Sequence, residues 1–192
     1  MTFTTYGIDG LDRLGKSTLI DGIRNELGYF EVIHFQKPQV LKAYELTKSE
    51  HPPVPKNMPL YHYQAESFRN SMLIAKSGAR VIFDRWHLGE AVYAPLYRGY
   101  SGDFVFDQER QARLDLCENI KLILLTEDFF KSTHFVDDGK SLGAAVNRPM
   151  EQHAFVNAFN KSIVKNKKII CVTDPNTGKF KHKDDILAEA LA

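Results

Sequence analysis

The chain has 192 residues, of which 43% are hydrophobic, and its formal net charge is +1. A chain of this length can bury one substantial core, and the balanced charge argues against nucleic acid or anionic lipid as the main partner. We therefore predict a single domain, residues 1–192, with small-molecule partners. Cys117 and Cys171 lack metal-type or redox-type spacing, and no run is long and apolar enough for a membrane span or a signal peptide. These features favour a cytoplasmic protein with reduced thiols.

The segment Gly10–Thr18 matches the pattern G-x-x-x-x-G-K-[ST]. In such a loop, backbone N–H groups cradle phosphates, the lysine reaches the β- and γ-phosphates, and the hydroxyl binds Mg²⁺. The preceding residues, Phe3–Asp9, favour a strand. The following residues, Lys16–Leu27, have apolar positions at helical spacing and end before Gly28. This strand–loop–helix context favours a phosphate-binding loop over a glycine-rich turn that binds nothing.

A second strand is expected at Phe30–Phe35, followed by Gln36-Lys37-Pro38. Ligand-binding residues of α/β sheets cluster just past the strand ends. Lys37 is therefore either a phosphate contact or an ordinary exposed lysine. A short helical stretch at residues 40–46 and a proline-rich surface loop at residues 51–56 are expected next.

A longer helix is predicted from Pro59 to Lys76, with an apolar stripe that includes Tyr61, Phe68 and Met72. Such a stripe is typical of core packing. Gln64 and Phe68, one turn apart, could instead hydrogen-bond and stack on a base, so both interpretations remain open.

Asp84 and Arg85 directly follow a predicted strand at Ala79–Phe83. P-loop enzymes place a carboxylate that organises Mg²⁺ at such a position, and the planar guanidinium of Arg85 suits a phosphate. A purely structural Asp–Arg pair is the alternative. A helix is expected at residues 86–93, with an irregular segment at residues 97–102.

The remaining elements predict a parallel sheet that is covered on both faces. We expect a helix at Asp107–Cys117, a central strand at Ile120–Leu125, a helix from Asn147, a strand at Lys168–Val172 and a last helix from about Asp184. The polar stretch at residues 132–147 is either a lid over a nucleotide or an exposed loop. The dispersed histidines His34, His62 and His87 form no metal-ligand pattern and are interpreted as structural or solvated.

The run Asp9-Gly10-Leu11-Asp12-Arg13-Leu14-Gly15-Lys16-Ser17-Thr18 resembles the E-G-[LV]-D-x-x-G-K-[ST]-T loop of thymidylate kinases, with Asp9 in place of glutamate. Asp84-Arg85, Tyr93 and the helix that begins at Arg148-Pro149-Met150 are similar to further family motifs. The sequence of residues 88–99 looks most like that of the bacteriophage members of the family. The resemblance implies an α/β P-loop kinase fold, a three-layer sandwich with a central five-stranded parallel sheet and helices on both faces.

The resemblance implies ATP-dependent phosphorylation of a deoxynucleoside 5′-monophosphate, with dTMP first among the acceptors. ATP and Mg²⁺ are the implied cofactors, and a homodimer is left open. The ATP phosphates would be held by Gly10, Leu14, Gly15, Lys16, Ser17 and Thr18, and Mg²⁺ by Ser17 and Asp84. The acceptor would be contacted by Asp12, Lys37, Phe68, Arg69, Arg85 and Tyr93. Catalysis is implied for Lys16, Arg13, Asp84 and Arg85, with Lys140 and Arg148 on the lid.

The resemblance leaves open which residues contact the base. Phe68 and Arg69 are fewer residues away from Asp84 than the base-contacting residues of the family are from its aspartate, so Tyr61 and Gln64 are competing candidates. The polar residues expected at Gly89 and Ala94 are missing. The main rival activity is that of a deoxynucleoside kinase, which would need a carboxylate base beyond the second strand, where this chain has Gln36 and Lys37. A GTPase switch is disfavoured because Asn166-Lys167-Lys168-Ile169 lacks the aspartate of a guanine motif. A noncatalytic nucleotide-binding module is the third alternative.

Overall fold

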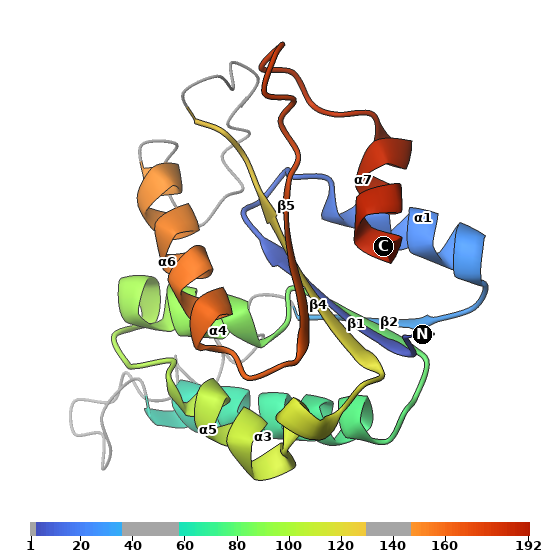
Figure 1. The fold of residues 1–192 in the computed structure, drawn as a ribbon. Coiled ribbons are helices and arrows are strands. Elements are labelled where there is room, and N and C mark those ends of the chain that lie inside the picture. Colours follow the sequence, from blue (N-terminus) through green and yellow to red (C-terminus); the bar gives the residue numbers. More distant parts are fainter. Residues whose placement is uncertain (1–2, 36–57, 130–146) are drawn as a thin grey trace.

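A parallel sheet forms the centre of the molecule (Figure 1). The computed structural model describes residues 3–35, 58–129 and 147–192. Within these ranges five strands pair in the order β2-β3-β1-β4-β5, all parallel. The strands are β1 (Thr5–Gly10), β2 (Glu31–His34), β3 (Val81–Asp84), β4 (Ile120–Thr126) and β5 (Asn166–Cys171). The predicted five-stranded parallel sheet is confirmed.

The burial of each strand follows its place in the sheet. Every residue of β1, β3 and β4 is buried, whereas β2 and β5 at the two edges are partly exposed. A strand covered on both faces needs a nearly continuous apolar sequence, which β4 has. Its predicted central position is confirmed, because it lies between β1 and β5.

Helices cover both faces of this sheet (Figure 1). In Figure 1, α1 and α7 lie on one side, and α3, α4, α5 and α6 lie on the other. Contacts between α1 and α7, α3 and α5, and α4 and α6 join the helices within each layer. The helices are α1 (Lys16–Leu27), α3 (Met58–Lys76), α4 (His87–Tyr93), α5 (Phe104–Ala112), α6 (Arg148–Lys161) and α7 (Lys183–Leu191). The expected three-layer α/β architecture is confirmed.

Two helical segments differ from the prediction. The helix expected at residues 107–117 begins earlier, as α5, and ends at Ala112. The next residue, Arg113, adopts a left-handed φ of 57° and donates its N–H to the carbonyls of Glu109 and Arg110. A 3-10 turn, η2 (Leu114–Leu116), follows. The helix α4 continues into a π-helical turn, η1 (Ala94–Arg98), where part of an irregular segment was expected.

Trp86 anchors the chain between β3 and α4. Its side chain is fully buried, stacks on Phe83 with ring centroids 4.8 Å apart, and donates its Nε1–H to Ser71 Oγ at 2.7 Å. A large aromatic ring with a satisfied polar group stabilises a core strongly. The backbone of Arg85 is therefore held between a buried strand and a buried ring.

Several predicted features lie outside the described residues. These are Lys37, the short helix at residues 40–46, the proline-rich loop at residues 51–56, Lys140, and all of the expected lid at residues 132–147 except Asn147. Among the helices that are described, none is long and apolar enough to span a bilayer.

Candidate active site

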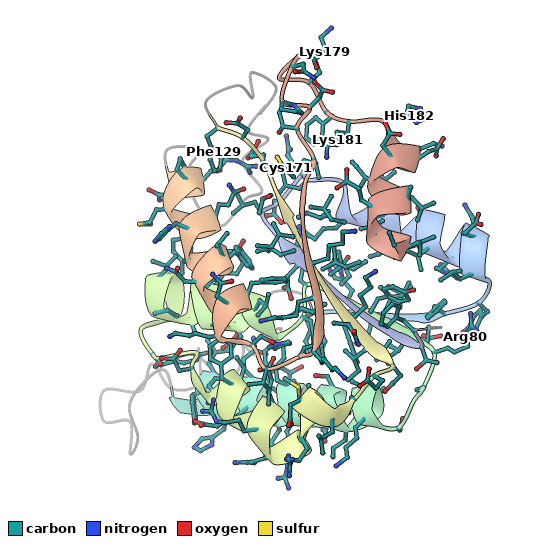
Figure 2. The ribbon with its side chains drawn as sticks, in the orientation of Figure 1. Arg80, Phe129, Cys171, Lys179, Lys181 and His182 are labelled. Carbon is teal, nitrogen blue, oxygen red and sulfur yellow. The ribbon has the colours of Figure 1, made fainter. Side chains whose placement is uncertain are left out.

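The carboxyl ends of the strands meet at one edge of the sheet. Figure 2 shows Phe129, which follows β4, and Cys171, which ends β5, at this edge, and Arg80, which precedes β3, at the opposite edge. Because parallel α/β sheets bind ligands outside the carboxyl ends of their strands, this edge is where a site is expected. The loop between β1 and α1 begins there.

Two glycines shape this loop. A Cβ on Gly10 would lie 2.4 Å from the Leu125 carbonyl oxygen, and Gly10 has a φ of +132°. Gly15, the residue before α1, has a left-handed φ of 82°. Both positions favour glycine for backbone reasons, and the turn lets the loop lead straight into the helix N-terminus. Ser17 and Thr18 are exposed in the first turn of α1.

Lys16 is buried under the loop. Its Nζ donates to the carbonyl oxygens of Gly10 at 3.0 Å and Leu11 at 2.6 Å, and lies 3.9 Å from Asp12 Oδ1. Burial, with a smaller contribution from the charge of Arg85, lowers the pKa of Lys16 to about 8. An anionic group placed beside the ammonium would favour its charged form again.

Asp12 and Arg85 form an ion pair above the sheet edge. Arg85 Nη2 lies 2.6 Å from Asp12 Oδ1, and both side chains are partly exposed. Arg85 has a left-handed φ of 61°, and the exposed Arg13 has one of 67°. Such backbone conformations are uncommon for non-glycine residues and concentrate at functional sites. The structure thus brings the predicted residues Asp12, Lys16 and Arg85 together.

Asp84 ends β3 and contacts His34 at the end of β2. His34 Nδ1 lies 2.6 Å from Asp84 Oδ2, whereas Asp84 Oδ1 is buried and has no hydrogen-bond partner among the described residues. The sequence interpretation of His34 as structural or solvated missed this contact. The signal that could have found it is that each residue lies within one position of the end of a predicted strand, and the two strands turn out to be neighbours.

A second carboxylate, Asp9, lies deeper, within β1. It is 1% exposed, and burial raises its pKa to about 6, while the charges of His87 and Lys16 act in the opposite direction. His87 is fully buried, and its Nε2 lies 2.5 Å from Glu109 Oε1. The floor of the site therefore contains titratable groups away from solvent.

Arg148 joins the first turn of α6 to the loop between β1 and α1. Its Nε donates to Glu127 Oε1 at 3.0 Å, and its Nη1 donates to the Asp12 backbone oxygen at 3.1 Å. The Gln152 amide accepts from Glu127 N and donates to Glu127 O. The arginine expected on the lid is thus a buried residue of α6 that fixes the backbone of the loop.

Tyr93 lies near enough to the Asp12–Arg85 pair for both charges to affect its pKa. It lies at the end of α4 and packs edge to face on Phe155, with ring centroids 5.5 Å apart. Burial raises the pKa of Tyr93 above its ordinary value, and the negative charges of Asp12 and Glu151 raise it further. The Tyr93 phenol is therefore an uncharged group near the ion pair.

The predicted base-contacting residues occupy different environments on α3. Phe68 is 2% exposed and stacks on Phe35 at 4.8 Å, so its ring takes part in core packing. The Arg69 side chain is 64% exposed and lies 3.8 Å from Glu66 on the same helix. The structure does not bring Arg69 to Asp12 and Arg85.

Gln64 belongs to a buried polar cluster centred on Glu90 that sequence reasoning missed. Glu90 is 2% exposed and accepts hydrogen bonds from Gln64 at 3.1 Å, from Tyr100 at 2.5 Å and from Arg98. Tyr61 packs edge to face on Tyr100. Burial of a carboxylate requires such partners, and the cluster holds α3, α4 and η1 together.

Gly89 and Ala94, the two positions at which polar residues were expected, lie on either side of Glu90 along α4 and η1. A Cβ on Gly89 would lie 3.6 Å from Asp9 Oδ1, an ordinary contact distance, so the backbone itself has room for a side chain. Ala94 is fully buried at the start of η1.

A pocket of about 140 Å³ lies between the end of the loop, α1 and the start of α7. Figure 2 shows Lys181 and His182 on the segment that leads into α7. The pocket is lined by Leu14, Gly15, Thr18, Leu19, Phe180, Lys181, Lys183 and Ile186. It is continuous with the loop residues predicted to hold phosphates.

The donor set suits a magnesium ion that is shared with phosphates. Residues 3–35, 58–129 and 147–192 contain no group of three or more His, Cys, Asp or Glu side chains that could hold a metal ion. Mg²⁺ is commonly bound by one or two protein oxygens, with phosphate oxygens and water as its remaining ligands. The unpartnered Asp84 Oδ1 and the exposed Ser17 hydroxyl are oxygen donors of this kind.

Similar solved structures are nucleotide kinases and a nucleotide-bound protein. Thymidylate kinase from Candida albicans superimposes with a TM-score of 0.60 at 15% identity, over 97% of this chain and 88% of that one. Thymidylate kinase from Ehrlichia chaffeensis gives 0.58 at 13% identity, over 100% and 98%. The chain has the fold of thymidylate kinases.

A third structure with this fold is the YorR protein of Bacillus subtilis in complex with phosphorylated GDP. It superimposes with a TM-score of 0.60 at 18% identity, over 97% of this chain and 93% of that one. Neither protein-family models nor curated proteins gave a match. In this chain β1 pairs with β3, so the loop after β1 and the end of β3 lie side by side.

Proposed function

We propose that this protein transfers the γ-phosphoryl group of ATP to the phosphate of a deoxynucleoside 5′-monophosphate, with dTMP as the first candidate acceptor. The observation that carries the proposal is the position of Asp12 between two cations, 2.6 Å from Arg85 and 3.9 Å from Lys16. Two adjacent cationic groups suit a reaction in which both substrates bring phosphates to one point. The thymidylate kinase fold supports the same class of reaction.

ATP would bind along the loop and the first turn of α1. The amides from Gly10 to Thr18 would hold its phosphates, and Lys16 would reach the transferred group. When bound, Mg²⁺ would neutralise charge on the β- and γ-phosphates, held by Ser17 and Asp84. The pocket beside Leu14 and Phe180 offers an apolar surface for the nucleoside of the donor.

The monophosphate would bind on the opposite side of the loop. Arg85 would hold its phosphate, with Lys37 as a second cation, and Asp12 and Tyr93 would face the sugar. For the base, the burial of Phe68 and the exposure of Arg69 favour the competing candidate Tyr61, with the buried Gln64 beside it on α3. These two lie on the part of α3 that faces Tyr100 and Glu90.

Positioning and cationic stabilisation would supply the rate, because the attacking phosphate is already anionic and needs no general base. Arg13 is our candidate for the arginine that stabilises the transferring group. Arg148, by contrast, is tied to Glu127 and to the loop backbone, so we assign it to holding the loop in shape. The strained backbone of Arg13 is consistent with a position fixed for function.

A deoxynucleoside kinase that acts on the unphosphorylated nucleoside is the second candidate. It would need a carboxylate base beyond β2 to accept the proton of the acceptor hydroxyl. The two residues that follow Phe35 are Gln36 and Lys37, neither of which can do this. An acceptor that arrives with its own phosphate agrees better with this sequence.

The test is a coupled assay of ADP release. ATP is offered with dTMP, dUMP, dGMP, dCMP, dAMP and modified pyrimidine monophosphates, and in a separate arm with free thymidine. We expect turnover with at least one deoxynucleoside monophosphate and none with thymidine. Turnover with thymidine alone would favour the nucleoside kinase. ATP binding without any turnover would favour a noncatalytic nucleotide-binding module.

A further inference from the structure

We infer that His34 is a positioning residue that fixes the Asp84 carboxylate, so that one carboxylate oxygen is presented to the metal–phosphate group of bound ATP. The inference rests on the proposed function, since it assigns Asp84 to Mg²⁺-ATP. It adds a residue outside the phosphate-binding loop and the Asp84-Arg85 pair.

Strand register brings the two side chains together. His34 pairs with Asp84 across the parallel β2–β3 ladder, and Phe35 N–H donates to the Asp84 backbone oxygen at 3.0 Å. Paired residues of neighbouring parallel strands point to the same face of the sheet. The imidazole Nδ1 therefore reaches Asp84 Oδ2 at 2.6 Å. Because an ionised carboxylate only accepts hydrogen bonds, Nδ1 is the nitrogen that carries the proton.

The two oxygens of Asp84 are in different environments. Oδ2 is held by His34, whereas Oδ1 is buried without a hydrogen-bond partner among the described residues. A buried carboxylate oxygen without a donor is costly unless a ligand supplies a cation or a hydrogen bond. The charge of Asp84 also raises the pKa of Lys16, so the carboxylate lies near the lysine that is predicted to reach the phosphates. Fixing Oδ2 prevents the carboxylate from turning Oδ1 away.

Apart from its contact with Asp84, the His34 side chain lies partly at the surface of the described part of the molecule. The residue lies on the edge strand β2, its side chain is 36% exposed, and it does not belong to the hydrophobic core. Substituting it therefore removes one hydrogen bond and little packing. A residue with this placement has the features of an outer hydrogen-bond partner that orients a metal-binding carboxylate.

The experiment compares ATP affinity in Mg²⁺ with ATP affinity in EDTA, by calorimetric titration. The variants are His34→Leu, which removes the donor, and His34→Asn, whose amide can replace Nδ1–H. We expect His34→Leu to reduce the Mg²⁺-dependent gain in ATP affinity about tenfold and to leave affinity in EDTA unchanged. His34→Asn should keep most of the gain. The matched control is His153→Leu, an exposed histidine of α6, which should change neither value.

Asp84→Asn provides the coupling test. If His34 acts through Asp84, His34→Leu should have no further effect on the Mg²⁺-dependent gain once Asp84 has been replaced. Equal losses of ATP affinity in Mg²⁺ and in EDTA would show a structural role and overturn the inference, as would an unchanged gain in His34→Leu. A native chain that binds Mg²⁺-ATP but phosphorylates no monophosphate would overturn the proposed function alone. Absence of any ATP binding by the native chain would overturn both.

Discussion

We predict that ATP binding weakens as the pH rises above neutrality, because the pKa of Lys16 is low. Burial lowers this pKa from its ordinary value of 10.5 to about 8. If the ATP complex needs the charged lysine, the affinity follows the charged fraction of the free protein. That fraction falls about 25-fold between pH 7.5 and pH 9.5, so the dissociation constant should rise by about the same factor.

Calorimetric titration of ATP at constant Mg²⁺ across this range measures the effect. Lys16→Arg should bind ATP with little pH dependence, because a guanidinium stays charged throughout. Lys121→Arg is the matched control, because Lys121 is also a buried lysine with a lowered pKa, located on β4 away from the loop. It should keep the native pH profile. A flat profile in the native chain, or the same slope in Lys16→Arg, would refute the reasoning.

Three further predictions concern the surroundings of the loop. Asp9→Asn should gain about 2 kcal/mol in unfolding free energy relative to the native chain between pH 4 and pH 7, because the raised pKa of about 6 means that Asp9 lowers stability as the pH rises through this window; parallel denaturant titrations check this, and a constant difference would contradict it. Arg148→Met should lower the unfolding free energy by about 3 kcal/mol in denaturant titrations, because the buried Glu127 carboxylate loses the Arg148 guanidinium as its partner. Replacing Glu127 by Leu as well should recover most of this loss. Asp12→Asn should change the affinities for ribo- and deoxyribonucleotide acceptors by different factors, and equal factors would remove Asp12 from the sugar contact.

The fold could be predicted from local sequence signals. The phosphate-binding loop, the buried run of β4 and the alternation of strands with helices are signals that depend on few residues, and the structure confirms the sheet they imply. The end of α5 could not be predicted, because Arg113 adopts a left-handed conformation that residue type does not favour.

The candidate site was predicted where its residues are close in sequence or follow strands. Asp12, Lys16, Asp84 and Arg85 meet at one sheet edge, as strand-end reasoning requires. The contact of His34 with Asp84 needs the strand order, in which β2 pairs with β3 and not with β1. Which strands are neighbours is a tertiary property that no single stretch of sequence encodes.

The environments of longer side chains also needed the structure. A helical stripe identifies Phe68 as apolar and one-sided, but stacking on Phe35 depends on how α3 lies over β2. Glu90 resembles an ordinary surface carboxylate in sequence, and only the packing of Gln64, Arg98 and Tyr100 around it explains its burial. The implied bacteriophage likeness and a homodimer stay predictions.

We propose that the loop after β1 and the end of β3 bind two different phosphate groups. The most direct test measures the dissociation constants of ATP and of dTMP separately in Lys16→Ala and Arg85→Ala. We predict a crossed pattern, in which Lys16→Ala mainly weakens ATP binding and also lowers turnover by about 10²-fold or more. Arg85→Ala should mainly weaken dTMP binding. Equal losses for both nucleotides in both variants, or native affinities throughout, would contradict the account.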